Sequence, residues 1–133
     1  MVAAAGELRR EGATTILLIG ASKGGTATLV AASQINPPVA GVVSLSGEAS
    51  YQGMDAMKSV KTLMLPVLFM AADQDSFGPG SPADARAMFA ASPSQDKQLV
   101  MLHGTEHGEE LLAGVSRAQA NSALNSFIAR ATS

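Results

Sequence analysis

The chain has 133 residues, 47% of them hydrophobic, with nine lysines and arginines against eleven aspartates and glutamates. It has no cluster of basic residues, a single tyrosine and no tryptophan, which argues against the basic surface and stacking platform of a nucleic-acid-binding protein. The lack of cysteine excludes disulfides and a thiol nucleophile and fits a cytoplasmic protein. The lack of a signal-peptide pattern, or of an apolar run of about 18 residues, argues against export or a membrane span.

The N-terminal half of the sequence predicts two helices that alternate with two strands. Gly12 is a typical helix stop, and the consecutive prolines Pro37 and Pro38 break the chain before an apolar run. In chain order we expect a helix over Met1 to Gly12, a strand over Thr14 to Ile19, a helix over Thr26 to Ala32 and a strand over Val39 to Leu45.

The C-terminal half continues the alternation. Ser81 and Pro82 are typical of a helix start, because serine caps the first turn and proline fits the first helical position. In chain order we expect a short helix over Gly53 to Leu63, a buried strand over Leu65 to Ala71, a helix over Ala83 to Ala91, a strand over Lys97 to Leu102 and a final helix over Glu109 to Ala131.

This order of elements predicts an α/β fold of three layers, with about four parallel strands alternating with helices. We expect one domain over residues 1–133, which is long enough to bury about two-thirds of its unfolded surface. If the strands lie side by side in chain order, right-handed crossovers place the intervening helices on one face. The terminal helix then covers the other face alone.

The pentapeptide GASKG at residues 20–24 is a G-x-S-x-G motif that follows a predicted strand and opens a predicted helix. This context is typical of a nucleophile elbow, a sharp turn that exposes the hydroxyl of its serine, here Ser22. The first backbone N–H groups of the helix carry partial positive charge and can stabilise an oxyanion that forms beside it. Ser22 is therefore the candidate nucleophile.

An acid and a histidine follow at the ends of later strands, in the chain order that a serine triad of this architecture needs. The loop after Ala71 offers Asp73 and Asp75, and the segment after Leu102 offers His103 and His107. In such a triad the histidine takes the serine proton, and the carboxylate orients the imidazole and stabilises its charged form.

Together these segments resemble the α/β-hydrolase family, especially its small serine esterases and its dienelactone-hydrolase-like members. The family's acid commonly lies in a G-x-x-D-x-x-x-P segment, which residues 72–79 match with alanine in place of the glycine. Its histidine commonly lies in a G-x-x-H-G segment, which residues 104–108 match. The resemblance spans nearly the whole chain and favours Asp75 and His107 as the acid and the histidine.

The resemblance also implies a truncated, minimal α/β-hydrolase fold that corresponds to the C-terminal half of a family member. The nucleophile of the family follows the fifth of about eight strands, so the first four strands have no counterpart here. The loop that donates the second oxyanion N–H goes with them, and the backbone N–H of Lys23 remains as the donor that the resemblance implies. Since losing one donor lowers turnover roughly 10²- to 10³-fold, we expect a slow enzyme.

The resulting hypothesis is a serine hydrolase, a carboxylesterase that cleaves short-chain carboxylic esters through an acyl-enzyme. Ser22 attacks the carbonyl, His107 acts first as base and then as acid, and Asp75 orients His107. We expect a small ester as the binding partner, and no cofactor, metal, nucleic acid or membrane. The alternative is a catalytically weak or inactive hydrolase-like domain that acts through self-assembly or partner binding.

Two other site classes fit the sequence less well. A phosphate-binding P-loop needs G-K-[ST] where this chain has Gly25 followed by Thr26. His103 and His107 are four residues apart, as in H-E-x-x-H zinc sites, but the glutamate is displaced and Gly104 weakens a helix there.

The strand predicted over Thr14 to Ile19 is apolar on both faces, as buried parallel strands are, yet it would lie at an edge of the sheet. We therefore expect a homo-oligomer that forms through this edge strand or through the thinly covered face of the sheet.

Overall fold

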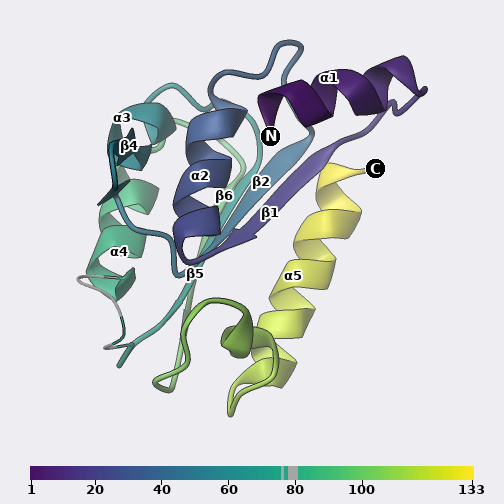
Figure 1. Ribbon diagram of the computed structural model, residues 1–133. Helices are drawn as coiled ribbons and strands as arrows, with labels where there is room; N and C mark the ends of the chain where they lie inside the picture. The colour runs from purple at the N-terminus through teal and green to yellow at the C-terminus, as the bar shows by residue number, and fades with distance from the viewer. Residues whose placement is uncertain (76, 78–80) are drawn as a thin grey trace.

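The computed structural model describes residues 1–75, 77 and 81–133, and its centre is a sheet of four parallel strands (Figure 1). The strands lie in the order β1-β2-β5-β6, so neighbours in the sheet follow one another along the chain. Their bounds are Leu17–Ala21 for β1, Gly41–Leu45 for β2, Val67–Ala72 for β5 and Lys97–Leu102 for β6. This arrangement confirms the predicted fold class and strand order.

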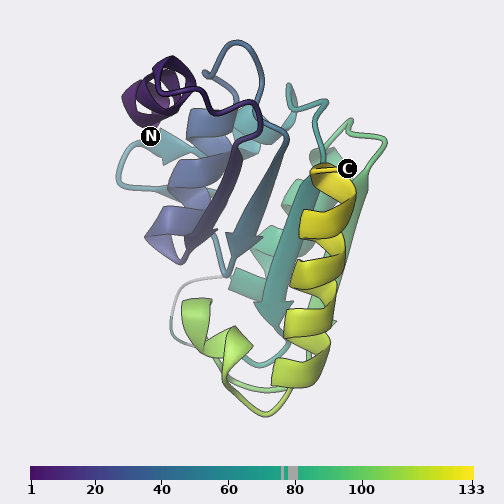
Figure 2. The same ribbon diagram turned by 90° about the vertical axis from the view of Figure 1, so that its right-hand side faces the viewer.

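Helices cover both faces of the sheet, as Figure 2 shows for α2 and α5. The apolar side chains of α1 to α4 pack into one cluster with one set of strand residues, whereas those of α5 and of the short 3₁₀-helix η1 pack into a second. The first face carries α1 (Val2–Arg10), α2 (Lys23–Ala32), α3 (Ala56–Val60) and α4 (Ser81–Ala91); the second carries η1 (Gly108–Leu112) and α5 (Arg117–Ala131).

The two central strands are buried along their whole length, which explains their continuous apolar sequences. Successive side chains alternate between the two clusters: Val42 and Phe69 face α2 to α4, whereas Val43 and Leu68 face α5. All four side chains are at most 1% exposed. A strand that is covered by helices on both faces has no side exposed to solvent, so its sequence does not alternate between apolar and polar residues.

The segment expected as a helix from Gly53 begins instead with a two-stranded antiparallel ribbon. Its strands are β3 (Ser50–Tyr51) and β4 (Met54–Asp55). The intervening Gln52 and Gly53 both have positive φ, which reverses the chain. The Asp55 side chain then accepts a hydrogen bond from the Lys58 N–H at 2.8 Å and starts α3.

The final helix is shorter than predicted, because the expected range from Glu109 divides into η1 and α5. The Val115 N–H donates to the Glu106 carboxylate at 2.7 Å instead of to a helical carbonyl. The Ser116 hydroxyl donates to the His103 carbonyl at 2.7 Å. Both hydrogen bonds join residues between η1 and α5 to the loop after β6. Because these loop groups take the place of helical hydrogen-bond partners, η1 ends before α5 begins.

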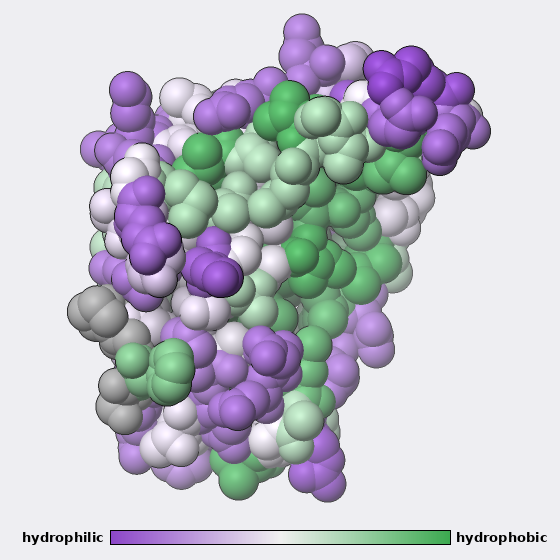
Figure 3. Space-filling model, viewed as in Figure 1, coloured by the Kyte–Doolittle hydropathy of each residue, from purple (hydrophilic) through white to green (hydrophobic). Residues whose placement is uncertain are grey.

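β1 forms one edge of the sheet and pairs only with β2 among the described residues. Ile19, in the middle of β1, is 46% exposed, although its neighbour in register, Val43, is fully buried. Figure 3 shows an apolar band on the surface at this side of the molecule, between α1 and α5. In the described part of the chain, no helix is long and apolar enough to cross a membrane.

Candidate active site

Ser22 lies on a sharp turn between β1 and α2. Its backbone is strained, with φ 55° and ψ −126°, a combination that residues other than glycine rarely adopt. A Cβ at Gly20 would collide with the backbone of Gly24, and a Cβ at Gly25 would lie 2.8 Å from the Ser44 hydroxyl. The strand and helix approach each other this closely only because both positions are glycine.

The turn leaves donors at the start of α2. The Ser22 carbonyl accepts hydrogen bonds from the Gly25 N–H at 2.8 Å and the Thr26 N–H at 3.2 Å. The N–H groups of Lys23 and Gly24 have no acceptor within the described residues. They lie at the positive end of the helix, where an anion that forms beside Ser22 is stabilised.

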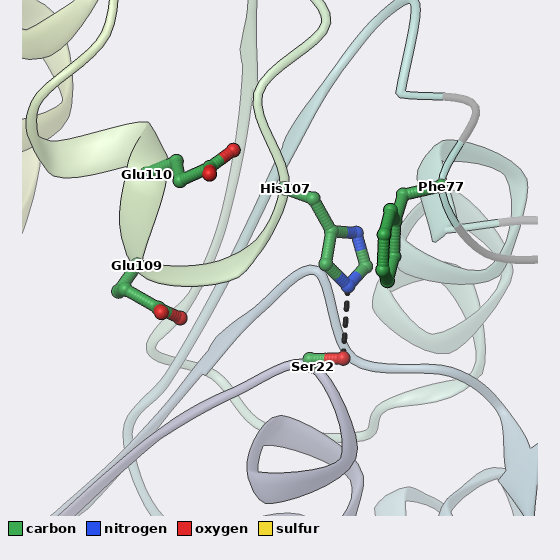
Figure 4. A pocket seen from close by; sticks show the side chains of 5 residues that line it. All are labelled: Ser22, Phe77, His107, Glu109 and Glu110. Carbon is green, nitrogen blue, oxygen red and sulfur yellow. Dashed lines mark hydrogen bonds between the residues drawn. The ribbon is translucent and has the colours of Figure 1, made fainter.

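Three side chains from three loops form a continuous hydrogen-bonded chain. His107 Nε2 lies 2.8 Å from Ser22 Oγ, the contact that is dashed in Figure 4. His107 Nδ1 lies 2.7 Å from Asp75 Oδ2. The three residues follow β1, β6 and β5, and the carboxyl ends of these parallel strands meet at one edge of the sheet. The structure therefore brings together Ser22, His107 and Asp75, as the sequence motifs predict.

The Asp75 side chain is fully buried and its second oxygen is also occupied, since Oδ1 accepts the Phe77 N–H at 3.1 Å. Burial raises the pKa of this carboxyl, but the hydrogen bonds from His107 and from the Phe77 N–H outweigh it and bring the pKa below its ordinary value. Asp75 is thus held ionised against His107. Ser76, Gly78 and Pro79 of the acid motif lie outside the described residues.

The alternative acid and histidine lie together, away from Ser22. Asp73 Oδ2 is 3.5 Å from His103 Nδ1, and Asp73 Oδ1 accepts the Gly104 N–H at 3.1 Å. The Gly104 N–H lowers the pKa of Asp73. Neither Asp73 nor His103 contacts Ser22, and the His103 side chain is 78% exposed. They form a surface pair, with Asp73 directly after β5 and His103 directly after β6.

Sequence reasoning missed the residues that hold the histidine loop. The Gly108 N–H donates to the buried hydroxyl of Ser46 at 3.0 Å, and the Glu106 carboxylate accepts the Val115 N–H. A Cβ at Gly108, where φ is 62°, would lie 3.5 Å from Ala21. The loop is therefore tied on both sides of His107. The one available signal was the position of Ser46 at the end of a predicted strand.

Ser22 and His107 open into a cavity of about 270 Å³ that is also lined by Phe77, Glu109 and Glu110. The Phe77 ring is 82% exposed, and its centroid lies 4.9 Å from that of His107 at a tilt of 37°. Figure 4 shows Phe77 on one side of the imidazole and both glutamates on the other. These three lining residues were not predicted, because Phe77 is at an unspecified position of the acid motif, and Glu109 and Glu110 lie outside the motifs.

The described residues offer no site for a metal. They contain no group of three or more histidine, aspartate and glutamate side chains that is close enough to hold one. In particular, His103 and His107 turn to different partners, Asp73 and Asp75.

No protein-family model and no curated protein matches the sequence. Solved structures do match. The monoacylglycerol lipase of Paleococcus ferrophilus aligns at a TM-score of 0.81 and 14% identity, over 98% of this chain and 74% of its own. The esterase domain of a Rhodothermus marinus protein aligns at 0.74 and 20%, over 96% and 66%. A dienelactone hydrolase from Anabaena variabilis aligns at 0.65 and 25%, over 84% and 47%.

These matches show that the chain has the α/β-hydrolase fold, at low sequence identity to solved esterases, lipases and dienelactone hydrolases. The chain spans between 47% and 74% of the length of the three hydrolases just described. The resemblance inferred from the motifs is therefore confirmed at the level of fold.

Proposed function

We propose that the protein is a serine hydrolase that cleaves short-chain carboxylic esters. The observation that carries the proposal is the unbroken contact from Ser22 through His107 to Asp75, with distances of 2.8 and 2.7 Å. A nucleophile, a base and an orienting carboxylate in mutual hydrogen-bond reach form the arrangement that acyl transfer requires. The hydrolase fold supports this assignment.

In the proposed mechanism, Ser22 Oγ attacks the ester carbonyl while His107 Nε2 takes its proton. The carbonyl electron pair moves onto oxygen and returns as the bond to the alcohol oxygen breaks, and the proton on Nε2 goes to the leaving alcohol. Water then attacks the acyl-enzyme by the same route and releases the acid. The protonated Nδ1 of His107 donates to Asp75 throughout, so that Nε2 faces Ser22 as the acceptor.

We assign stabilisation of the oxyanion to the backbone N–H of Lys23 at the start of α2. The N–H of Gly24 also lacks an acceptor in the described part of the chain, but it is the next donor of the same turn and not one from a separate loop. An oxyanion site with one well-placed donor is expected to be roughly 10²- to 10³-fold slower than a complete one. The protein is therefore proposed as a slow esterase.

The test is the hydrolysis of p-nitrophenyl acetate and butyrate by the wild type and by Ser22→Ala. We expect steady turnover with an initial burst of p-nitrophenolate from the wild type, and a rate at background from the variant. Ser33→Ala is the matched control, since Ser33 is an exposed serine at the other end of α2. Equal rates for the wild type and Ser22→Ala would overturn the proposal.

One observation favours a second function, assembly without efficient catalysis. β1 leads directly into Ser22 and has one edge unpaired among the described residues, and its residue Ile19 is exposed. Edge strands of this kind template pairing with another chain. If the Ser22→Ala variant is as active as the wild type, assembly through β1 becomes the better proposal.

A further inference from the structure

The cavity beside Ser22 has an acidic wall. Of its five described lining residues, Ser22 and His107 define where an ester carbonyl would lie, Phe77 is apolar, and Glu109 and Glu110 carry negative charge. In Figure 4 both glutamates project from η1 on the side of His107 away from Phe77. No lysine or arginine is among the described residues that line the cavity.

The charge of these two carboxylates is not neutralised nearby. Within the described chain, neither Glu109 nor Glu110 forms an ion pair with a lysine, arginine or histidine, and neither side chain accepts a hydrogen bond. Lys23 follows the nucleophile, but it does not line the cavity. Other carboxylates at this edge of the sheet do have partners: Asp73, Asp75 and Glu106 each accept a backbone N–H.

A charged wall beside a nucleophile acts on the charge of the substrate. A positive group in the cavity is attracted to the carboxylates, and a negative group is repelled, by an amount that salt reduces. The cavity is slightly below the range of about 300 to 1,000 Å³ that is usual for ligand pockets, and so suits a small substrate. Because the wall lies next to Ser22, this charge effect acts on the bound ester itself.

We propose that the cavity lined by Glu109 and Glu110 selects small esters that carry a positive charge, such as choline esters, over neutral and carboxylate-bearing esters. The inference rests on the proposed hydrolase function, since it names the substrate class of that site. Ser22 becomes acylated, the bond to the cationic alcohol breaks, and this alcohol leaves with the proton from His107 Nε2. The positive charge takes no part in the chemistry and serves only recognition.

The experiment compares three thioesters of similar size. They are acetylthiocholine, its neutral isostere S-(3,3-dimethylbutyl) thioacetate, and the anionic 3-(acetylthio)propionate. Released thiol is measured with a disulfide reagent, which the protein itself does not consume because the chain has no cysteine. Since exposed charges interact weakly, we expect kcat/KM for the cation to exceed that for the neutral isostere by roughly 3- to 10-fold at low salt. The ratio should fall toward one in 0.5 M salt, at a Debye length of about 4 Å.

The variant Glu109→Gln/Glu110→Gln should bring the ratio of cationic to neutral kcat/KM close to one. This ratio is measured within one preparation, so partial loss of folded protein does not affect it. The matched control Glu7→Gln/Glu11→Gln removes the same net charge from the N-terminal segment and should keep the wild-type ratio.

The outcomes separate the two proposals. If the neutral thioester is hydrolysed but the ratio is near one, or is the same in the Glu109→Gln/Glu110→Gln variant, the charge selection is wrong and the hydrolase proposal stands. If no thioester is hydrolysed and p-nitrophenyl esters are not turned over either, both proposals fall.

Discussion

The buried hydroxyl of Ser46 accepts the backbone N–H of Gly108 at 3.0 Å and so joins the end of β2 to the residue after His107. Ser46 is fully buried and has a φ of 50°, a conformation that costs energy for any residue with a side chain. Its own N–H donates to the carbonyl of Met70, within β5. The position of the His107 imidazole beside Ser22 therefore depends on Ser46, which has no hydrogen bond to Ser22, His107 or Asp75 among the described residues.

Removing the Ser46 hydroxyl should reduce the turnover of an ester more than its binding. We expect Ser46→Ala to lower kcat for p-nitrophenyl acetate about 3- to 30-fold with little change in KM, because a displaced general base costs rate and not affinity. Ser44→Ala is the control: this buried hydroxyl has no partner in the described chain, so its removal should leave kcat unchanged. A rise in KM with constant kcat in Ser46→Ala would contradict the positioning role.

Asp75 and Asp73 should differ sharply when each is changed to asparagine. We expect Asp75→Asn to lower kcat by up to about 10⁴-fold, as loss of the orienting carboxylate does in serine proteases. Asp73→Asn should stay within about threefold of the wild type, since Asp73 contacts His103 and the Gly104 N–H and not His107. Equal losses in the two variants would mean that the acid is wrongly assigned.

Asp75→Asn should also change how the free energy of unfolding depends on pH. The hydrogen bonds to Asp75 bring its folded-state pKa below the unfolded value of about 3.9, so they stabilise the fold above that pH. The stabilisation is lost as pH falls through the folded-state pKa. Urea unfolding measured at pH 6 and at pH 3 gives the free energy of unfolding at each pH. The decrease between pH 6 and pH 3 should be larger in the wild type than in Asp75→Asn. Asp73 and Glu106, whose pKa values are also lowered, are present in both proteins and cancel in the comparison.

The two glycines of the elbow motif should respond differently to alanine. A Cβ at Gly20 would collide with the Gly24 backbone, so Gly20→Ala should destabilise the fold by about 2 kcal/mol or more. A Cβ at Gly24 meets nothing within 4 Å, and Gly24→Ala should be neutral or stabilise α2 by up to about 1 kcal/mol. Thermal unfolding of the two variants measures both. If Gly24→Ala were destabilised, the turn would lack the space for a Cβ that its geometry indicates.

Self-association through β1 remains a prediction. We propose a second copy of this chain as the partner, because two edge strands related by a two-fold axis pair antiparallel and place each exposed Ile19 against its counterpart. Light scattering at micromolar concentration should give a dimer for the wild type and a monomer for Ile19→Lys. A wild type that is strictly monomeric would contradict it.

Apolar patterning and motif spacing were sufficient to predict the sheet and the contacts that join Ser22, His107 and Asp75. The strand Lys97–Leu102 was predicted with its observed bounds. His107 was preferred to His103 because its greater distance from the strand end lets the ring reach back to Ser22, and because residues 104–108 match G-x-x-H-G. The division of the last helix was not predictable, because it depends on the Glu106 carboxylate reaching the Val115 N–H. That hydrogen bond exists only once the chain is folded, and so does the acidic wall that Glu109 and Glu110 form.

The central strands β2 and β5 are hydrogen-bonded to a neighbouring strand on both sides, whereas β1, which leads into Ser22, is paired on one side among the described residues. Backbone amides of such an outer strand open more often than those of the interior, in local excursions that leave the core intact. Each excursion carries Ser22 away from His107. We therefore expect heating to separate Ser22 from His107 before it melts the core, so that the temperature range over which the site is assembled is narrower than the range over which the protein is folded.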